Sequence, residues 1–134
     1  MVFKTRGMTC YTYRMTDLEF EDLVRRALME IPDGIQARLS NVDLVVEYRP
    51  SKGQLVGSGI EDGECLLGLY EGIPLTERYD YDMVLPDKIT LFQEAIEEIC
   101  SGDDEVIKEV RDTVIHEIAH HFGIDDERIQ EMEA

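Results

Sequence analysis

Cysteines are few in this sequence, and no two of them lie close together. Cys10, Cys65 and Cys100 are far apart, and no Cys-x-x-Cys pair occurs. Neither a thiolate zinc site nor a disulfide framework is therefore indicated. Reduced thiols are typical of the cytoplasm, which is the location that we expect for this protein.

A long apolar run is also missing from the first residues. The segment MVFKTRGMTCYTYRMT is polar and contains no hydrophobic stretch of the kind that a secretory signal or a transmembrane anchor needs. We therefore expect no membrane partner, and this expectation agrees with the cytoplasmic location.

Basic residues are scarce relative to acidic ones. The chain has 13 Lys and Arg against 30 Asp and Glu, which gives a formal net charge of −17. Such a surface repels phosphates, so nucleic acid and anionic membranes are not expected partners. The acidity favours basic or neutral peptides as partners, although acidity that only keeps the protein soluble is the simpler interpretation.

With 134 residues, of which 43% are hydrophobic and 32% charged, the chain fits one soluble globular domain, 1–134. Thr16 and Glu19 form a capping-box pattern that opens a helix, and Pro32 ends it. We expect Leu18, Leu23, Ala27, Leu28 and Ile31 on its buried side. Residues 1–15 show no clear period and predict partial disorder or a short strand.

The remaining elements mix strands and helices without strict alternation, which favours the α+β class. Strands are predicted at 42–48, 65–70 and 88–92, followed by a helix or helical turn at 93–100. Residues 49–64 and 75–86 predict loops. A long helix is expected from about residue 102 to Phe122, with acidic residues in its first turn.

All three histidines lie in the stretch HEIAHHFGIDD, from His116 to Asp126. On a helix, His116 and His120 are one turn apart and about 40° apart around the axis, so both imidazoles can bind one ion. Zn²⁺ binds neutral imidazole readily and keeps one position for water in catalytic sites. Glu117 is placed to act as the general base toward that water.

A third ligand is needed, and the residues after the second histidine offer one. Gly123 can leave the helix in a left-handed conformation, so that the chain turns back toward the metal. Asp126 follows three residues later. Asp125 and Glu127 are adjacent competitors that spacing alone does not exclude.

The stretch HEIAHHFGIDD resembles the extended zincin motif HExxHxxGxxH/D. With LLGLYEGIPLTER and PDKITLF ahead of it, the chain resembles the short bacterial zincin-like metallopeptidases. The resemblance implies a minimal zincin-like domain, in which a small mixed sheet packs with an N-terminal helix and a C-terminal active-site helix. It also implies Zn²⁺ as cofactor and a peptide or protein as substrate. His116, His120 and Asp126 would be the zinc ligands and Glu117 the general base.

The helix that carries the motif has an apolar back. Around the helix axis, the side opposite the two ligand histidines holds Ile107, Val110, Val114 and Ile118, and Ile115 and Phe122 widen it. Glu109, Asp112 and Thr113 fall on the ligand side. We therefore expect a helix that is buried behind and polar in front, like the floor of a cleft.

Several neighbouring residues have two interpretations. His121 points about 140° away from His116 and is more simply a packed or supporting residue than a ligand. Asp112 and Glu109 either orient a ligand imidazole or belong to a charged helix face. The candidates for stabilising an oxyanion, for all of which packing is the simpler role, are Tyr70, Tyr79, Tyr81 and Arg78.

The sequence thus predicts a zinc-dependent peptidase that hydrolyses peptide bonds with a metal-activated water. The alternative is a metal-binding or peptide-binding zincin-like protein with little or no turnover. A third possibility is a structural zinc, which predicts four protein ligands and no bound water.

Overall fold

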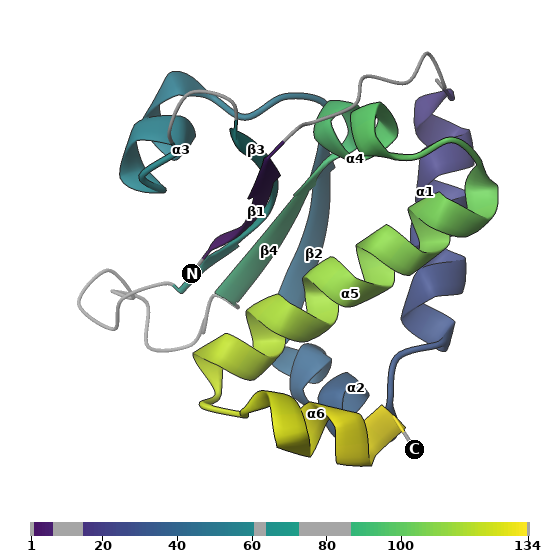
Figure 1. Cartoon of the computed structure of the whole chain (residues 1–134), viewed down its shortest axis with the longest axis vertical. Helices are drawn as coiled ribbons and strands as arrows, with labels where there is room; N and C mark the ends of the chain where they lie inside the picture. Colours follow the sequence, from purple (N-terminus) through teal and green to yellow (C-terminus); the bar gives the residue numbers. More distant parts are fainter. Residues whose placement is uncertain (1, 7–14, 61–63, 73–86, 134) are drawn as a thin grey trace, which may run out of the picture.

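The computed structural model describes residues 2–6, 15–60, 64–72 and 87–133. It contains a four-stranded mixed sheet and helices on both of its faces (Figure 1), which confirms the predicted α+β class. The strands are β1 (Val2–Arg6), β2 (Val42–Glu47), β3 (Glu64–Glu71) and β4 (Asp87–Phe92). The predicted strands 42–48, 65–70 and 88–92 are all present, each within a residue at either end.

The order of the strands across the sheet is β1-β3-β4-β2. The strand β3 pairs antiparallel with both β1 and β4, whereas β2 pairs parallel with β4. Parallel pairing needs a crossover connection, and the chain between β2 and β4 supplies one that includes β3. Consequently β3 lies inside the sheet, with a described neighbour on each side.

Six α-helices and one 3₁₀ helix are described. They are α1 (Asp17–Met29), α2 (Asp33–Gln36), η1 (Ala37–Asn41), α3 (Lys52–Gly57), α4 (Gln93–Ile99), α5 (Asp103–His121) and α6 (Asp126–Glu133). Helix α5 crosses the sheet diagonally, and α1 lies beside it (Figure 1). Among the described residues, no helix combines the length and the apolar character that crossing a bilayer would require.

Helix α1 begins with the predicted capping box. The Thr16 side chain accepts from the Glu19 backbone N–H, and the Glu19 carboxylate accepts from the Thr16 backbone N–H. The buried stripe is Phe20, Leu23, Val24, Ala27 and then Ile31. Leu18 was predicted to be buried and is instead 78% exposed, because a stripe with i, i+3, i+4, i+7 spacing starts at Phe20 and leaves Leu18 on the solvent side.

Strand β3 contains an irregularity that decides which of its side chains face α5. Its register with β1 shifts so that Phe3 stands opposite Gly68 and Lys4 opposite Leu66, which skips Leu67. A bulge of this kind breaks the strict alternation of faces. Leu67 and Tyr70 therefore both join the main core under α1 and α5. A smaller core on the other face contains Leu66, Leu69 and Phe92 and is covered by Leu55 and Ile60.

Two predictions on the irregular segments were incomplete. Residues 49–64 were predicted as a loop, but α3 occupies Lys52–Gly57 because Ser51 and Gln54 form a second capping box. Helix α6 was not predicted either, and it packs Ile129 into the main core. The predicted loop 75–86 lies outside the described residues.

Candidate metal centre

Helix α5 carries all three histidines and begins and ends as its sequence predicts. Asp103, Asp104 and Glu105 fill its first turn, where the positive end of the helix dipole favours carboxylates. At its other end Gly123 adopts a φ of 70°. The Ile124 N–H donates to Ala119 O at 2.7 Å and the Gly123 N–H to His120 O at 3.3 Å, which is a complete Schellman motif. The expected left-handed exit at Gly123 is thereby confirmed.

The imidazole of His116 is oriented by the backbone of its own helix. His116 Nδ1 lies 2.7 Å from the carbonyl oxygen of Asp112. A carbonyl oxygen only accepts, so in the neutral ring Nδ1 carries the proton and Nε2 carries the lone pair. Metal-bound histidines commonly donate their second N–H in this way. His116 thus has the tautomer that a metal ligand needs at Nε2.

The rings of His116 and His120 lie on the same part of the helix surface. Their centroids are 6.1 Å apart, and the ring planes are nearly perpendicular at 80°. With Zn–N bonds of about 2 Å, two imidazoles that share one tetrahedral ion have ring centroids about 5 Å apart. His116 is half-buried and His120 is exposed. The pair therefore fits a zinc ion after a small rotation of a side chain.

Glu117 is a carboxylate that is buried between helix α5 and the sheet. Its side chain is 1% exposed, and neither carboxylate oxygen has a partner among the described residues. Burial raises the pKa of Glu117 to about 7, and the nearby backbone N–H of Tyr70 offsets only part of this effect. A buried carboxylate without a hydrogen bond lowers the stability of a folded protein. A polar group beside it, such as a metal-bound water, would offset this loss.

The face of α5 that holds Glu117 lies against strand β3. Thr113 is fully buried one turn before Glu117, and its Cγ2 lies 2.6 Å from where a β-carbon on Gly68 would stand. The prediction that Thr113 belongs to the polar front of the helix was therefore wrong. The reason is that Gly68 lets the helix approach the sheet closely, so that Thr113 and Glu117 are covered.

The apolar back of α5 is largely as predicted. Val110, Val114 and Ile118 are fully buried and Ile115 nearly so. Phe122 is 47% exposed, because it lies at the end of the helix beyond the sheet-covering turns, where the Arg38 guanidinium stands 5.6 Å from its ring centroid. Phe122 therefore does not widen the buried surface.

The three candidates for the third ligand differ in their contacts and in whether their side chains are described. Asp125 Oδ1 accepts from the Arg128 N–H at 2.9 Å, so Asp125 caps the first turn of α6. Glu127 is exposed on the same helix. Asp126 begins α6, and its side chain lies outside the described part of the structure. Within the described side chains, no group of three His, Cys, Asp or Glu forms a metal-binding cluster.

Two carboxylates were considered as orienting groups for His116. The Asp112 carboxylate instead pairs with Lys108 at 2.9 Å and Arg111 at 3.2 Å, so only its backbone carbonyl reaches the imidazole. Burial raises the pKa of Glu109, as does the charge of Asp112, while His116 lowers it. Glu109 therefore lies within electrostatic reach of His116.

Among the oxyanion candidates, Tyr70 is engaged elsewhere. Its hydroxyl donates to Asp87 Oδ2 at 2.7 Å, and its ring stacks on His121 with centroids 4.1 Å apart. His121 is thus packed against the sheet, as the simpler interpretation predicts. Arg78, Tyr79 and Tyr81 lie outside the described residues. No signal in the sequence points to Asp87 or Gly68, because each acts through a residue that only the folded chain brings next to it.

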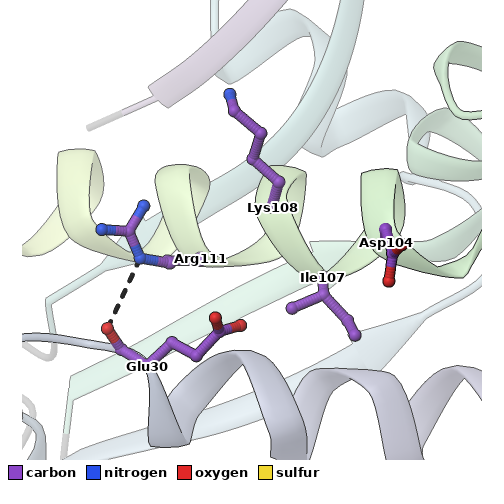
Figure 2. Close-up of a pocket in the computed structure, with 5 residues that line it drawn as sticks. All are labelled: Glu30, Asp104, Ile107, Lys108 and Arg111. Atoms are coloured by element: carbon purple, nitrogen blue, oxygen red, sulfur yellow. Dashed lines mark hydrogen bonds between the residues drawn. The ribbon is translucent and has the colours of Figure 1, made fainter.

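A groove elsewhere on α5 lies apart from the histidines. Figure 2 shows its lining between α1 and the first half of α5, where Arg111 donates to the backbone oxygen of Glu30 at 3.4 Å. The other lining residues are Asp104, Ile107 and Lys108. Charges of both signs line this groove, so it selects no one class of ligand.

Residues 39–134 match the family model described as zincin-like metallopeptidase. A solved structure of a conserved hypothetical protein from T. thermophilus is similar, with a TM-score of 0.50 and 24% sequence identity. The similarity covers 81% of this chain and 94% of that one, and it concerns the fold. No curated protein matches the sequence.

Proposed function

Because the chain belongs to the zincin-like metallopeptidase family, we propose that it is a zinc-dependent peptidase that hydrolyses peptide bonds. The observation that carries the proposal is the carboxylate of Glu117. It is buried, neither of its oxygens has a hydrogen-bond partner among the described residues, its pKa is raised to about 7, and it stands between two histidines on one helix. A carboxylate of this kind accepts a proton near neutral pH, which a general base must do.

His116 and His120 would hold the zinc ion through imidazole nitrogens, with Asp126 as the third ligand. When bound, zinc lowers the pKa of its water and polarises the scissile carbonyl. Glu117 then takes the proton of the attacking water and later gives it to the departing amine nitrogen. The Asp112 carbonyl keeps the His116 ring in the ligating orientation throughout.

The surroundings of Glu117 support this role. Glu117 is 1% exposed, and the close approach of Thr113 to Gly68 holds the same helix face against β3. Exclusion of water raises its basicity and strengthens its interaction with a bound substrate. The net charge of −17 further favours peptides that are basic or neutral over acidic ones.

The decisive experiment compares the wild type with Glu117→Gln. Zinc content is measured by metal analysis, and hydrolysis is measured on a peptide library that varies in net charge. Glu117→Gln should bind zinc and lose hydrolysis by at least about 10²-fold, the range of a general base. Glu97→Gln is the matched control, since Glu97 is a buried glutamate that bonds to Met15 and Gln93 in another part of the fold.

Equal hydrolysis by wild type and Glu117→Gln would overturn the assignment of Glu117 as the general base. A zinc-loaded wild type that cuts no peptide would instead favour a binding protein with little turnover. Four protein ligands around the metal, without a bound water, would indicate a structural zinc.

A further inference from the structure

Three side chains from three different elements meet beside the candidate metal centre. Tyr70 on β3 donates its hydroxyl to Asp87 Oδ2 at 2.7 Å, and Asp87 is the first residue of β4. The Tyr70 ring stacks on His121 with an interplanar angle of 21°. His121 Nε2 lies 3.7 Å from the same Asp87 oxygen. We call Tyr70, Asp87 and His121 the clamp.

The members of the clamp differ in burial, and Tyr70 is the buried one. Tyr70 is 3% exposed, and the side chains of Asp87 and His121 are 24% and 35% exposed. Burial, together with the hydrogen bond to Asp87, raises the pKa of the Tyr70 hydroxyl well above its ordinary value. The hydroxyl therefore remains protonated, and a donor to Asp87, at neutral pH.

The clamp joins the sheet to the part of α5 that most needs support. His121 is the last residue of the helix, and the candidate ligand His120 precedes it in the same turn. The last turn of a helix opens more readily than its middle, and here the Schellman motif at Gly123 binds the carbonyls of Ala119 and His120 but holds no side chain in place. His120 is moreover exposed, so no core packing holds its ring.

Strand β3, which carries Tyr70, also packs against the turn of α5 that holds the general base. Thr113, Glu117 and His121 are spaced four residues apart and therefore follow one face of α5. Along this face, Thr113 abuts Gly68 and His121 stacks on Tyr70, so β3 supports the helix at both ends of the Glu117 turn.

We propose that Tyr70 and Asp87 are positioning residues, which hold the last turn of α5 through His121 and so fix His120 for metal binding. The proposal rests on the zinc site of the proposed function. Helix α5 does not need the clamp in order to fold, since Val110, Val114 and Ile118 anchor the helix in the core. Loss of the clamp should act on the last turn alone.

The size of the effect follows from other metal sites. Removing a residue that supports a ligand commonly weakens metal binding by about 10–100-fold. We therefore expect Asp87→Ala to weaken zinc binding by about 10-fold or more. Asp87→Asn keeps an oxygen that accepts from the Tyr70 hydroxyl and should retain most of the affinity. Tyr70→Phe keeps the stacking on His121, and its zinc affinity should fall between those of Asp87→Ala and Asp87→Asn.

The experiment measures zinc affinity by competition with a chromophoric chelator, and amide hydrogen exchange of the metal-free proteins. Asp87→Ala should speed exchange at residues 119–124 and leave residues 106–114 unchanged. Glu71→Gln is the matched control, because Glu71 follows Tyr70 on β3 but lines a groove with Ser51 and Gln54 of the α3 region. This control should match the wild type in both measurements.

Zinc affinity of Asp87→Ala equal to that of the wild type would overturn the proposal, as would exchange that rises equally along all of α5. The latter result would mean that Asp87 serves general stability. Neither readout requires turnover. If the wild type binds zinc but cuts no peptide, the proposed peptidase activity is wrong. The role of the clamp is then still tested by zinc affinity and amide hydrogen exchange.

Discussion

Thr113 on helix α5 and Gly68 on strand β3 are in direct contact: a β-carbon at position 68 would stand only 2.6 Å from Thr113 Cγ2. Real β-carbons do not come this close to another carbon, so only glycine permits the observed spacing of helix and strand. The contact lies one turn before Glu117 on the same helix face. It therefore sets how deeply the candidate base is buried.

Gly68→Ala should push α5 away from the sheet, because the added methyl group has no space. We expect a loss of about 1–3 kcal/mol in the free energy of unfolding, as overpacked cores show, measured by urea denaturation. Zinc binding should weaken in the same variant, since α5 carries both histidines. Gly57→Ala is the control: nothing lies within 4 Å of its added carbon, and it should be neutral or slightly stabilising. Equal stability of the two variants would refute the contact.

Glu117→Gln should stabilise the zinc-free protein at pH 8. Burial raises the pKa of Glu117 from 4.5 to about 7, so its contribution to stability is fully present below pH 4.5 and is lost as the pH rises through 7. At pH 8 the ionised carboxylate is buried without a hydrogen-bond partner among the described residues, and the neutral amide removes this penalty, which is about 3 kcal/mol at most at about 1.4 kcal/mol per pKa unit. Urea denaturation at pH 4 and pH 8 tests this, and a constant difference between the two proteins would contradict it.

The sequence predicted the parts of the fold that local chemistry decides. Thr16 with Glu19, the acidic first turn of α5 and the positive φ of Gly123 each need only neighbouring residues, and each was found. The two ligand histidines follow from helix spacing in the same way. Their placing on one face, with centroids 6.1 Å apart, is a property of the helix alone.

What the sequence left open depends on pairing between distant segments. The bulge at Leu67 turns Gly68 and Tyr70 toward α5, and no local pattern announces a register shift. Thr113 was placed on a polar face because helix spacing ignores the neighbouring strand. Asp87 meets Tyr70 across 17 residues of chain, most of which lie outside the described residues.

Asp126→Ala and Asp125→Ala should separate the metal ligand from the helix cap. Asp125 accepts from the Arg128 N–H, so its removal should lower the free energy of unfolding by about 1 kcal/mol and leave zinc affinity unchanged. Asp126→Ala should weaken zinc binding by at least about 10-fold if Asp126 is the third ligand. Zinc titration with a competing chelator measures both. The reverse pattern would assign the third ligand to Asp125.

Gly123→Ala tests whether the turn after α5 serves the metal site. Gly123 has a φ of 70° and Gly59 a φ of 66°, and an added β-carbon meets nothing within 4 Å at either position. Each alanine variant should therefore lose about 1–2 kcal/mol of folding free energy, because left-handed backbone is strained for residues with a β-carbon. Gly123 links His120 to Asp126, whereas Gly59 follows α3. Only Gly123→Ala should weaken zinc binding, and an equal loss in Gly59→Ala would mean that affinity tracks stability rather than the geometry of this turn.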